Sequence, residues 1–394
     1  MIDQAFSTAY GCLFGLSDAF SNWESFKSKA KAQLTKTEKY IFKRDKAEET
    51  EIQKEFHILR TLYEKFPNSV EIEEKLLSLK IRTHSLRMNT VKSMISKTHY
   101  RELETDRYSI ATARVLQKNS SINRTVLNIR NLEGNITEKQ DDVLLEYERQ
   151  YAQLFKSGNT DPSSIEEFML ETPHGTANAE DRIRLGNPIK ENEVLESIND
   201  LTPNKSPGED GLSSEFYKTY KNYLVPFMTK LFNQIIEKEA MPPTMYSGII
   251  SQIYKGSGPK EERKNWRPLT MLNTDYKIFT KIMVKRLKPA MNKMVHPDQT
   301  CAVKNRDIRD GLNKIYNIIH YTEKNDVEGM ILSVDHMSAF DIIEWEYLFK
   351  TLEHFQLGSY FIKTIKSIYK NGLVYSKVQI NGHISRKFNI SRGI

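Results

Sequence analysis

The sequence predicts an α+β protein with a helical N-terminal extension. Residues 23–103 are rich in Lys, Glu, Gln and Leu and contain no glycine, which is typical of long helices. After about residue 186, helical stretches alternate with short apolar runs, such as those at 248–254 and 329–334. Near the C-terminus, Asn381-Gly382 separates two β-prone runs, and Asn-Gly favours the two-residue turn of a hairpin. Helices and strands are therefore both expected in the second half of the chain.

Composition sets broad limits on function. A chain of 394 residues is long enough for about two to three domains. The net charge of +7 is compatible with an anionic partner and equally with a soluble basic protein that has none. Cys12 and Cys301 lie far apart in the sequence, so neither a Cys/His zinc cluster nor a disulfide scaffold is expected. We expect no signal peptide and no transmembrane segment, and hence an intracellular protein of the cytosol or nucleus.

The helical extension is expected to form two antiparallel helices. Apolar residues recur at spacings of three and four along one face, with Thr83 and Thr90 in the same stripe: Ile72, Leu76, Leu79, Leu86 and Met94. Pro67 marks the break between the helices, because proline disfavours helical backbone in the residue before it. A dimerising coiled coil is the alternative, but the polar gaps in the stripe favour a solvated helical hairpin.

The next region mixes strand and helix. Residues 125–137 place a Glu-Gly-Asn turn between two β-prone runs, which predicts a hairpin. Residues 141–155 predict an amphipathic helix, with one face formed by Val143, Leu144, Tyr147, Tyr151 and Leu154. Residues 157–185 are rich in Gly, Ser, Thr, Asn and Pro, which indicates a linker. The expected division is a helical extension at 1–160, a linker at 161–190 and an α+β domain at 191–394.

An apolar run at 331–334 ends on Asp335, and Asp341 follows six residues later. A carboxylate at the end of a buried strand lies where the core opens to a cleft, and Mg²⁺ prefers carboxylate ligands together with substrate phosphates. Asp335 is therefore a candidate metal ligand, with an ordinary loop or cap residue as the alternative. Asp341 also fits the cap of a helix that starts near Ile342. After Glu353 the sequence contains no Asp or Glu that could act as a partner carboxylate.

Two further stretches carry basic residues in patterns suited to phosphate. Lys205 and Asp210 lie in a loop rich in Pro and Gly, and such a loop can approach a phosphate backbone closely. Lys255 and Arg267 flank a Gly-Ser-Gly turn and a charged excursion. They supply a point charge and a bidentate fork, the two devices that proteins use on triphosphates. A surface turn and a solvated basic hairpin are the alternatives.

The C-terminal segment 354–394 carries seven Lys or Arg residues and no acid. Its basic residues are expected to form a strip that follows a phosphate backbone. Its aromatic residues, such as Phe361 and Tyr369, occur at helical spacing, which favours a place in the core over stacking on bases.

Four stretches in this order resemble the fingers and palm of the reverse transcriptase from LINE-type non-LTR retrotransposons, in the clade related to the Tx elements. They are NKSPGEDG (204–211), NWRPLTMLNTDYKIFTKIMVKRL (265–287), HPDQTCAV (296–303) and LSVDHMSAFDIIEWEYLFKTLEHF (332–355). The resemblance covers roughly residues 195–394. Residues 23–160 are more weakly similar to the helical region that joins the endonuclease to the polymerase in these elements.

The resemblance implies fingers and a partial palm of a right-hand polymerase, which adds dNTPs to a DNA primer on an RNA template with two Mg²⁺ (or Mn²⁺) ions. It implies that Asp335 binds metal and that Lys255 and Arg267 bind the triphosphate. It also implies that Phe340, next to Ala339, excludes a 2′-hydroxyl group. The template- or primer-binding residues that it implies are Lys205, Asp210, Gln299, Lys304 and Arg392.

Two departures from the family pattern bear on activity. His336-Met337-Ser338 stand where the family usually has a lysine-containing pair before Ala-Phe-Asp. In the family the partner carboxylates belong to a Tyr-x-Asp-Asp hairpin, which is expected beyond residue 394. We therefore expect a fragment truncated before that hairpin and inactive as an isolated chain. A non-catalytic nucleic-acid-binding protein and an unselected relic of the element are the alternatives.

Overall fold

The structure is a computed structural model that describes residues 2–393 with gaps. The gaps are residues 16–17, 67–68, 70, 81, 83–124, 159 and 172–174. The expected helical positions Leu86 and Met94 therefore lie outside the described residues. Within the described part, no helix is both long and apolar enough to cross a membrane.

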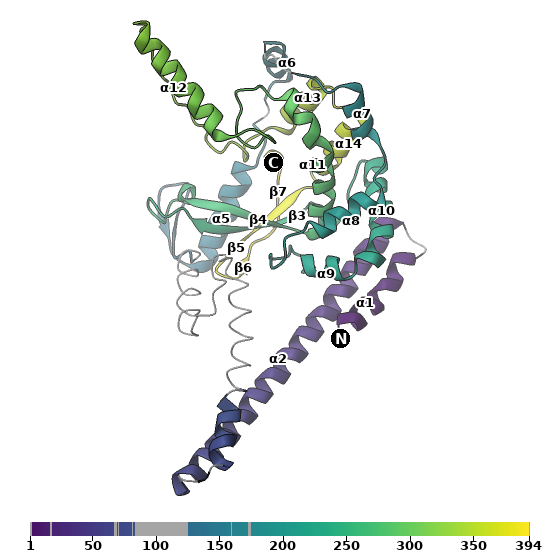
Figure 1. The fold of residues 1–394 in the computed structure, drawn as a ribbon, viewed down its shortest axis with the longest axis vertical. Coiled ribbons are helices and arrows are strands. Elements are labelled where there is room, and N and C mark those ends of the chain that lie inside the picture. Colours follow the sequence, from purple (N-terminus) through teal and green to yellow (C-terminus); the bar gives the residue numbers. More distant parts are fainter. Residues whose placement is uncertain are drawn as a thin grey trace.

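The N-terminal region is helical (Figure 1). It consists of α1 (Ile2–Tyr10), a 3₁₀ turn η1 (Gly11–Phe14) and the long α2 (Ala19–Lys65). Asp18 caps α2 by accepting a hydrogen bond from the backbone N–H of Phe20 at 2.9 Å. α2 ends just before Pro67, and Arg82 pairs with Glu48 at 2.8 Å. A second helical segment thus returns along α2, which confirms the predicted break and the antiparallel arrangement.

A layer of helices encloses the larger core (Figure 1). They are α7 (Ala179–Gly186), α8 (Glu191–Asn199), α9 (Ser214–Thr219), α10 (Lys221–Lys238), α11 (Thr274–Met294), α13 (Trp345–His354) and α14 (Ser359–Ile368). Phe232 of α10 packs on Phe279 of α11 with ring centroids 5.2 Å apart. Trp23 and Phe26 of α2 belong to the same core. The N-terminal extension is therefore packed into the domain that follows it.

The main sheet has the order β4-β3-β5-β6, with β7 also paired to β5. Its strands are β3 (Ser247–Tyr254), β4 (Trp266–Leu272), β5 (Tyr375–Ile380), β6 (His383–Ile384) and β7 (Phe388–Asn389); the turns η2 (Pro243–Tyr246) and η3 (Arg263–Asn265) precede β3 and β4. β3 runs antiparallel to β4 and parallel to β5. β5 and β6 form the predicted hairpin, in which Asn381 and Gly382 have φ of 50° and 89°. These positive φ values match the turn that Asn-Gly favours.

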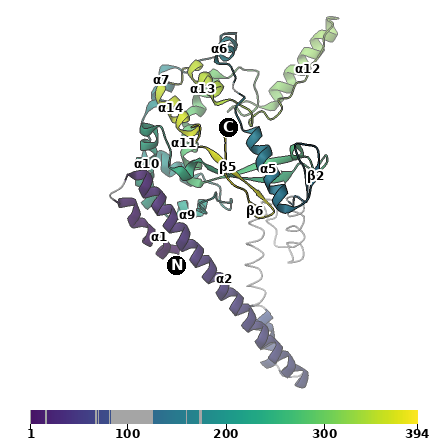
Figure 2. The same cartoon turned by 180° about the vertical axis from the view of Figure 1, so that it is seen from behind.

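One face of the sheet is covered by α5 (Gln140–Leu154), which lies across it in Figure 2. Val143, Tyr147 and Tyr151 of α5 are buried in a second core that includes residues of β3, β4 and β5. The Tyr151 hydroxyl donates to Gln252 Oε1 of β3 at 2.9 Å. A small hairpin, β1 (Ile129–Arg130) and β2 (Ile136–Thr137), precedes α5. The predicted hairpin and the predicted amphipathic helix are both confirmed.

Helices occupy the segment in which the composition indicated a linker. α6 (Pro162–Glu171) packs on α13, where Lys350 pairs with Glu166 at 2.9 Å. α7 follows in the same segment, with Asn178 as its cap. The residues that suggested a linker are helix-start signals, because proline suits the first helical turn and Asp or Asn suits the cap. The division of the chain at residues 161–190 stays an expectation. Both hydrophobic cores contain residues from before and after this segment.

The predicted strand at 329–334 is not formed. The segment has no ladder partner among the described strands, and Ile331, Leu332 and Val334 are 68–80% exposed. A β-prone run becomes a strand only where a neighbouring strand offers an edge and the run can bury one face. The neighbouring α12 (Ile308–Lys324) projects from the body and has no buried residue (Figure 1).

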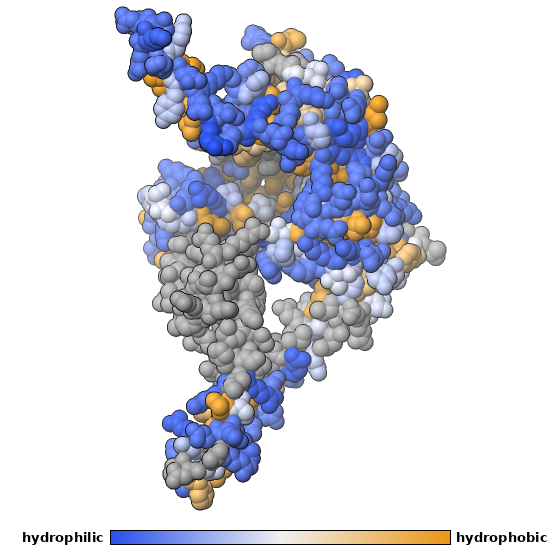
Figure 3. All heavy atoms as spheres, in the orientation of Figure 1, coloured by the Kyte–Doolittle hydropathy of each residue, from blue (hydrophilic) through white to orange (hydrophobic). Residues whose placement is uncertain are grey.

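Taken together, the described residues form mixed helices and sheets, as the predicted α+β class requires. In Figure 3 polar residues cover most of the visible surface, and apolar side chains appear in a hollow near the centre of this face. The buried residues of the larger core come from helices and turns, whereas the core beneath α5 contains the strand residues Ile250, Trp266, Val378, Ile380 and Phe388. This arrangement leaves a stretch of the β3–β4 ribbon uncovered.

Replacement of Trp23 by alanine tests how strongly α2 is joined to the larger core. The indole is fully buried and stacks on Phe26 and Phe227 with centroids 5.2 and 5.8 Å away. We expect Trp23→Ala to lower the free energy of unfolding by about 3–5 kcal/mol, because removal of the indole leaves a cavity between packed aromatic rings. Urea unfolding followed by circular dichroism measures this change.

Ile58→Ala, on the exposed side of the same helix, is the matched control. Ile58 is 60% exposed, so its truncation should change the unfolding free energy by less than about 0.5 kcal/mol. Equal effects of the two substitutions would contradict the assignment of α2 to the core.

Candidate nucleic-acid interface

A cleft of about 440 Å³ lies on the face of the β3–β4 ribbon opposite α5. Its floor is formed by strand residues, and its walls come from the loop before α9 and from α11. The lining residues are Leu201, Thr202, Lys205, Ser206, Ser214, Ser251, Gln252, Ile253, Leu269, Thr270, Met271, Lys277 and Lys281. A floor that includes the apolar residues Ile253, Leu269 and Met271, with amines in the walls, suits a nucleotide, which has a flat base and an anionic phosphate.

Three lysines give the cleft its positive charge. Lys277 and Lys281 are four residues apart on α11 and therefore point to the same side of that helix. Lys205 is exposed on the opposite wall. Burial lowers the pKa of Lys277, and the Asp210 carboxyl group acts in the opposite direction. Lys281 donates to the backbone oxygen of Asp200 at 2.6 Å.

Arg267 extends the basic surface along the ribbon. The register pairs Arg267 with Ile253, so both side chains point to the face on which Ile253 lines the cleft. Arg267 is exposed at the end of the ribbon, beyond the cleft. Lys255 follows β3 at the same end, where its backbone N–H donates to the oxygen of Asn265 at 2.9 Å. The structure thus brings the predicted pair Lys255 and Arg267 to one end of the ribbon.

The loop that carries Lys205 is held close to the start of α11. Gly208 packs so tightly that a Cβ atom there would come within 2.5 Å of the backbone nitrogen of Asn273. The backbone N–H of Asp210 donates to Asn273 Oδ1 at 3.2 Å. Only glycine fits this approach, which explains the Pro-Gly sequence of the loop in physical terms. The lysine-bearing loop is therefore fixed against the helix that bears Lys277 and Lys281.

Beneath this loop lies a buried cluster of charged groups that sequence reasoning missed. Lys27 of α2 donates to Asp275 Oδ2 at 2.7 Å, and Asp210 Oδ2 lies 3.8 Å from the same amine. Trp23 Nε1 donates to Asp275 Oδ2 at 2.8 Å. The only signal in the sequence is that Lys27 stands among the apolar residues of its helix, beside Phe26. Asp210, which the resemblance made a nucleic-acid contact, is buried in this cluster and does not reach the cleft surface.

The segment that contains Asp335, residues 331–341, forms no metal site with the other described residues. Asp335, Ala339 and Phe340 are exposed, with 69% of Phe340 accessible to solvent. Among the described residues no group of three or more His, Cys, Asp or Glu side chains could hold a metal ion. The predicted metal ligand therefore has no partner ligands in this arrangement.

Asp341 lies near two cations at the end of the β3–β4 ribbon, Arg263 and Lys255. Burial raises the pKa of its carboxyl group, while Arg263 and Lys255 act to lower it. Asp341 does not cap a helix, since α13 begins at Trp345 after the cap residue Glu344. The alternative assignment of Asp341 as a helix cap was therefore wrong, because further residues separate it from the helix.

The remaining predicted contacts fall in two other places. Gln299 and Lys304 are exposed in the 295–306 loop, which Arg306 stabilises by donating to backbone oxygens, including that of Gln299 at 2.8 Å. Arg392 is half-buried, where it pairs with Glu344 at 3.5 Å and donates to the oxygen of Leu154 at 2.8 Å. Arg392 thus joins the C-terminal segment to α5 and α13.

Most of the basic C-terminal segment is likewise engaged within the chain. Ion pairs connect its cations to acids elsewhere: Lys363 to Glu239, Lys366 to Glu353, Lys377 to Glu209 and Arg386 to Glu148. Phe361 is buried in the larger core, as its helical spacing predicted. The expected phosphate-following strip is therefore mostly neutralised, because acids distant in the sequence come to lie beside it.

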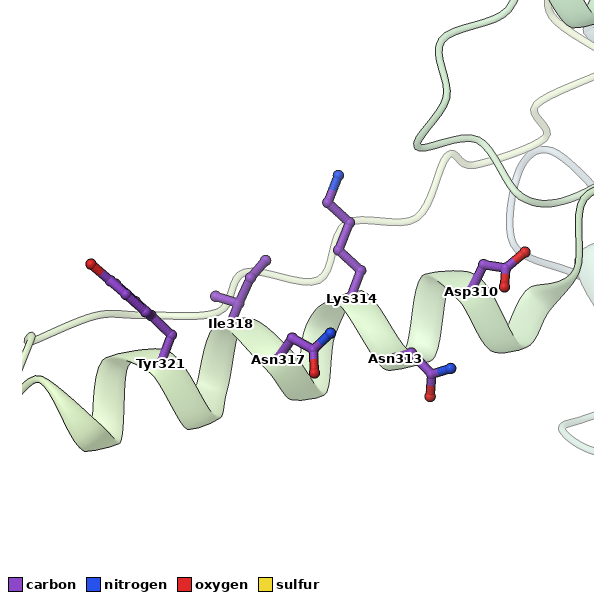
Figure 4. Close-up of a pocket in the computed structure, with 6 residues that line it drawn as sticks. All are labelled: Asp310, Asn313, Lys314, Asn317, Ile318 and Tyr321. Carbon is purple, nitrogen blue, oxygen red and sulfur yellow. The ribbon is translucent and has the colours of Figure 1, made fainter.

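A second pocket, of about 410 Å³, follows one side of α12. Figure 4 shows its lining residues along successive turns of that helix: Asp310, Asn313, Lys314, Asn317, Ile318 and Tyr321. Lys314 pairs with Asp298, so its charge is already compensated. With a single helix supplying its lining, this pocket is a poorer ligand site than the cleft on the ribbon.

Comparison with known proteins places this arrangement in a class. Residues 258–394 match the family model described as reverse transcriptase (RNA-dependent DNA polymerase). The matched part contains β4, α11 and the Asp335 segment. Residues 258–394 are thus similar in sequence to reverse transcriptases.

Curated relatives narrow the class to retrotransposons. The chain is 30% identical over 244 residues to the Transposon TX1 uncharacterized 149 kDa protein of Xenopus laevis, a match that covers 62% of this chain and 18% of that protein. It is 30% identical over 104 residues, 26% of this chain and 12% of the relative, to the probable RNA-directed DNA polymerase from transposon X-element of Drosophila melanogaster. It is 23% identical over 174 residues, 44% of this chain and 17% of the relative, to the Pol polyprotein from the type-1 retrotransposable element R1 of Bradysia coprophila.

These matches confirm the resemblance inferred from the four motifs. Residues 258–394 are similar to the reverse transcriptase family, and the chain is similar to proteins of LINE-type, non-LTR retrotransposons. It spans less than a fifth of the length of each of these relatives.

Titration with Mn²⁺ tests the arrangement of the acidic segment. A lone exposed carboxylate binds divalent ions weakly, because such ions need several oxygen ligands. We expect the chain to show no stoichiometric Mn²⁺ site below millimolar concentration by electron paramagnetic resonance, and Asp335→Ala to leave the titration unchanged. Tight binding that Asp335→Ala abolishes would contradict the exposed, unpartnered position of this residue.

Proposed function

We propose that the chain forms the fingers and part of the palm of a retrotransposon RNA-directed DNA polymerase, and that the cleft on the β3–β4 ribbon holds the template strand. The observation that carries this proposal is the common face shared by the cleft lysines and Arg267. Lys205, Lys277 and Lys281 contact template phosphates, while the apolar floor accommodates a base. The names of the relatives support RNA as the template.

The end of the ribbon is proposed to bind the incoming dNTP. Lys255 and Arg267 lie there with exposed side chains, and a point charge next to a guanidinium fork suits a triphosphate. Asp341 lies near Lys255, so segment 331–341 lies beside this end of the ribbon. In this proposal Ala339 and Phe340 border the nucleotide's sugar, and Gln299 and Lys304 contact the template or primer from the neighbouring loop.

The metal ions that the family implies do not fit the described residues as they stand. Phosphoryl transfer by a two-metal mechanism needs several carboxylate oxygens close together, and Asp335 stands alone and exposed. We therefore derive no catalytic step through a metal for these residues. The 394-residue chain by itself is proposed to bind nucleic acid and nucleotide without polymerising.

One observation favours a second function, that of a nucleic-acid-binding protein without catalysis. Lys205, Lys255 and Arg267 are exposed and Lys277 and Lys281 are half-buried at the cleft, whereas the described residues form no group of acidic or other side chains that could hold a metal ion. Binding and catalysis therefore depend on different parts of the fold. A primer-extension assay and a binding assay separate the two functions.

Charge reversal tests the template cleft. We expect Lys205→Glu and Lys281→Glu each to weaken binding of single-stranded RNA, because each removes a cation that neutralises a phosphate. The slope of log K against log salt concentration should become shallower by about 0.7 for each phosphate that is no longer neutralised. Fluorescence anisotropy with labelled oligouridine at several salt concentrations measures both effects.

Lys54→Glu, on the exposed surface of α2, provides a control with the same change in net charge. It should alter affinity and slope far less than the cleft variants. If all three variants weaken binding equally, the cleft is not the binding site and only the overall charge matters.

Primer extension tests the catalytic part of the proposal. With an RNA template, a DNA primer, dNTPs and either Mg²⁺ or Mn²⁺, the isolated chain should give no extension product, because its carboxylates are not assembled. Template-dependent synthesis by the purified chain, absent from an Asp335→Ala control, would overturn this expectation.

A further inference from the structure

The loop before α9 is tied to distant elements by two consecutive residues. The backbone oxygen of Glu209 accepts a hydrogen bond from Lys31 Nζ of α2 at 2.6 Å. The carboxylate of Glu209 pairs with Lys377 of β5 and accepts a hydrogen bond from Ser247 of β3. The position of Lys205, four residues earlier, therefore depends on contacts made by the N-terminal helix and the sheet.

Asp210, the next residue, reaches into the buried cluster. One buried amine, that of Lys27, faces two buried carboxyl groups, and it lies 2.7 Å from Asp275 Oδ2 and 3.8 Å from Asp210 Oδ2. Asp275 also accepts hydrogen bonds from Trp23 and from its neighbour's backbone N–H. Asp210 Oδ2, by contrast, has no hydrogen-bond partner in the described structure. The lysine is thus committed to Asp275, and Asp210 is the less compensated group.

The other charged and titratable groups around Asp210 come from each element packed against it. They are Glu24, Lys27 and Lys31 of α2, Tyr217 of α9, Asp275 and Lys277 of α11, and Glu209 of the same loop with its partner Lys377. Burial and the repulsion of Asp275 raise the pKa of Asp210 to about 7, although Lys27 acts to lower it. A carboxyl group in this position changes its charge near neutral pH.

We propose that Asp210 is a pH-sensitive positioning residue that latches the Lys205 loop onto α2 and α11 when it carries a proton. Only the expected effect of this latch on RNA binding rests on the proposed function. The latch itself is a property of the loop and can be measured without any ligand.

The direction of the pH effect follows from the two states of the loop. In the closed loop Asp210 is buried and retains its proton up to about pH 7, whereas in an open loop it is hydrated and ionises near its ordinary pKa of about 3.9. The closed loop therefore binds more protons, so it loses stability as the pH rises from about 4 to 7 and stays at the lower level above that. Below about pH 4 both states are protonated and the closed loop has its full stability.

The loop is the part that can open at least cost. Its residues 202–206 are exposed, and Gly211 has φ of +75°, which makes it a natural hinge. α2 and α11 are fixed by Trp23, Phe26 and Phe279, which are fully buried. Hydration of an ionised Asp210 therefore requires release of the loop and not separation of the helices.

Hydrogen exchange of the free protein tests the latch. Peptides covering 203–212 are compared between the wild type and Asp210→Asn at the same pH, from about pH 5.5 to 8, which cancels the intrinsic effect of pH on exchange. We expect the protection of the wild type, divided by that of Asp210→Asn, to fall by at least about tenfold between about pH 5.5 and 7 and then to level off, since asparagine cannot ionise. Asp142→Asn, at an exposed position of α5, should match the wild type throughout.

Two results would overturn the latch. Equal protection of the loop in wild type and Asp210→Asn at every pH would show that Asp210 does not control it. A pH-dependent difference that appears equally in peptides of α11 would show a global change in stability instead of a local latch.

The consequence for RNA is tested separately. The affinity of the wild type for oligouridine, divided by that of Asp210→Asn, should fall between about pH 5.5 and 7 and then level off. If the latch is observed but this ratio is constant, the link between the loop and RNA is wrong. If Lys205→Glu has no effect on affinity while the latch is present, the proposed template cleft fails and the latch stands.

Discussion

A single lysine, buried between two carboxyl groups, connects the elements that form the walls of the proposed template cleft. Lys27 joins α2 to the start of α11 through Asp275 and to the loop of Asp210. Burying charges is costly, and it is tolerated here because Lys27 and Asp275 lie 2.7 Å apart and compensate each other, while Asp210, at 3.8 Å, is the less compensated group. The walls of the cleft, one on the loop and one on α11, are therefore fixed relative to each other by a residue of the N-terminal helix.

A lysine or arginine binds an external phosphate less well when the folded chain already places an acidic side chain beside it. Lys363, Lys366 and Arg392 have acidic partners within the chain, which lowers their value for an external anion. Lys281, in contrast, donates to the neutral backbone oxygen of Asp200, whose carboxyl group it also influences. Lys205, Lys255 and Arg267 are exposed at the cleft and the ribbon.

The structure places the residues proposed to bind nucleic acid and the segment around Asp335 in different parts of the fold. The ribbon and cleft are built on strands that are fully paired with each other and on a helix anchored in the core. The segment around Asp335, which the resemblance implies binds metal, lies outside both cores with its apolar side chains exposed. A carboxylate is useful to a metal only when other ligands surround it, and this surrounding is a property of tertiary structure.

The sequence by itself determined the elements whose signals are local. Val143, Tyr147 and Tyr151 mark the buried face of α5 by their spacing, Asn381-Gly382 marks a turn, and the ordered motifs show the resemblance to reverse transcriptases. Only the tertiary structure decided which charges are buried, because Lys27 and Asp275 meet across 248 residues of sequence. It also decided that 329–334 is not a strand and that Asp210 is buried, since periodicity describes a segment's own preference and not the neighbours that satisfy or neutralise it.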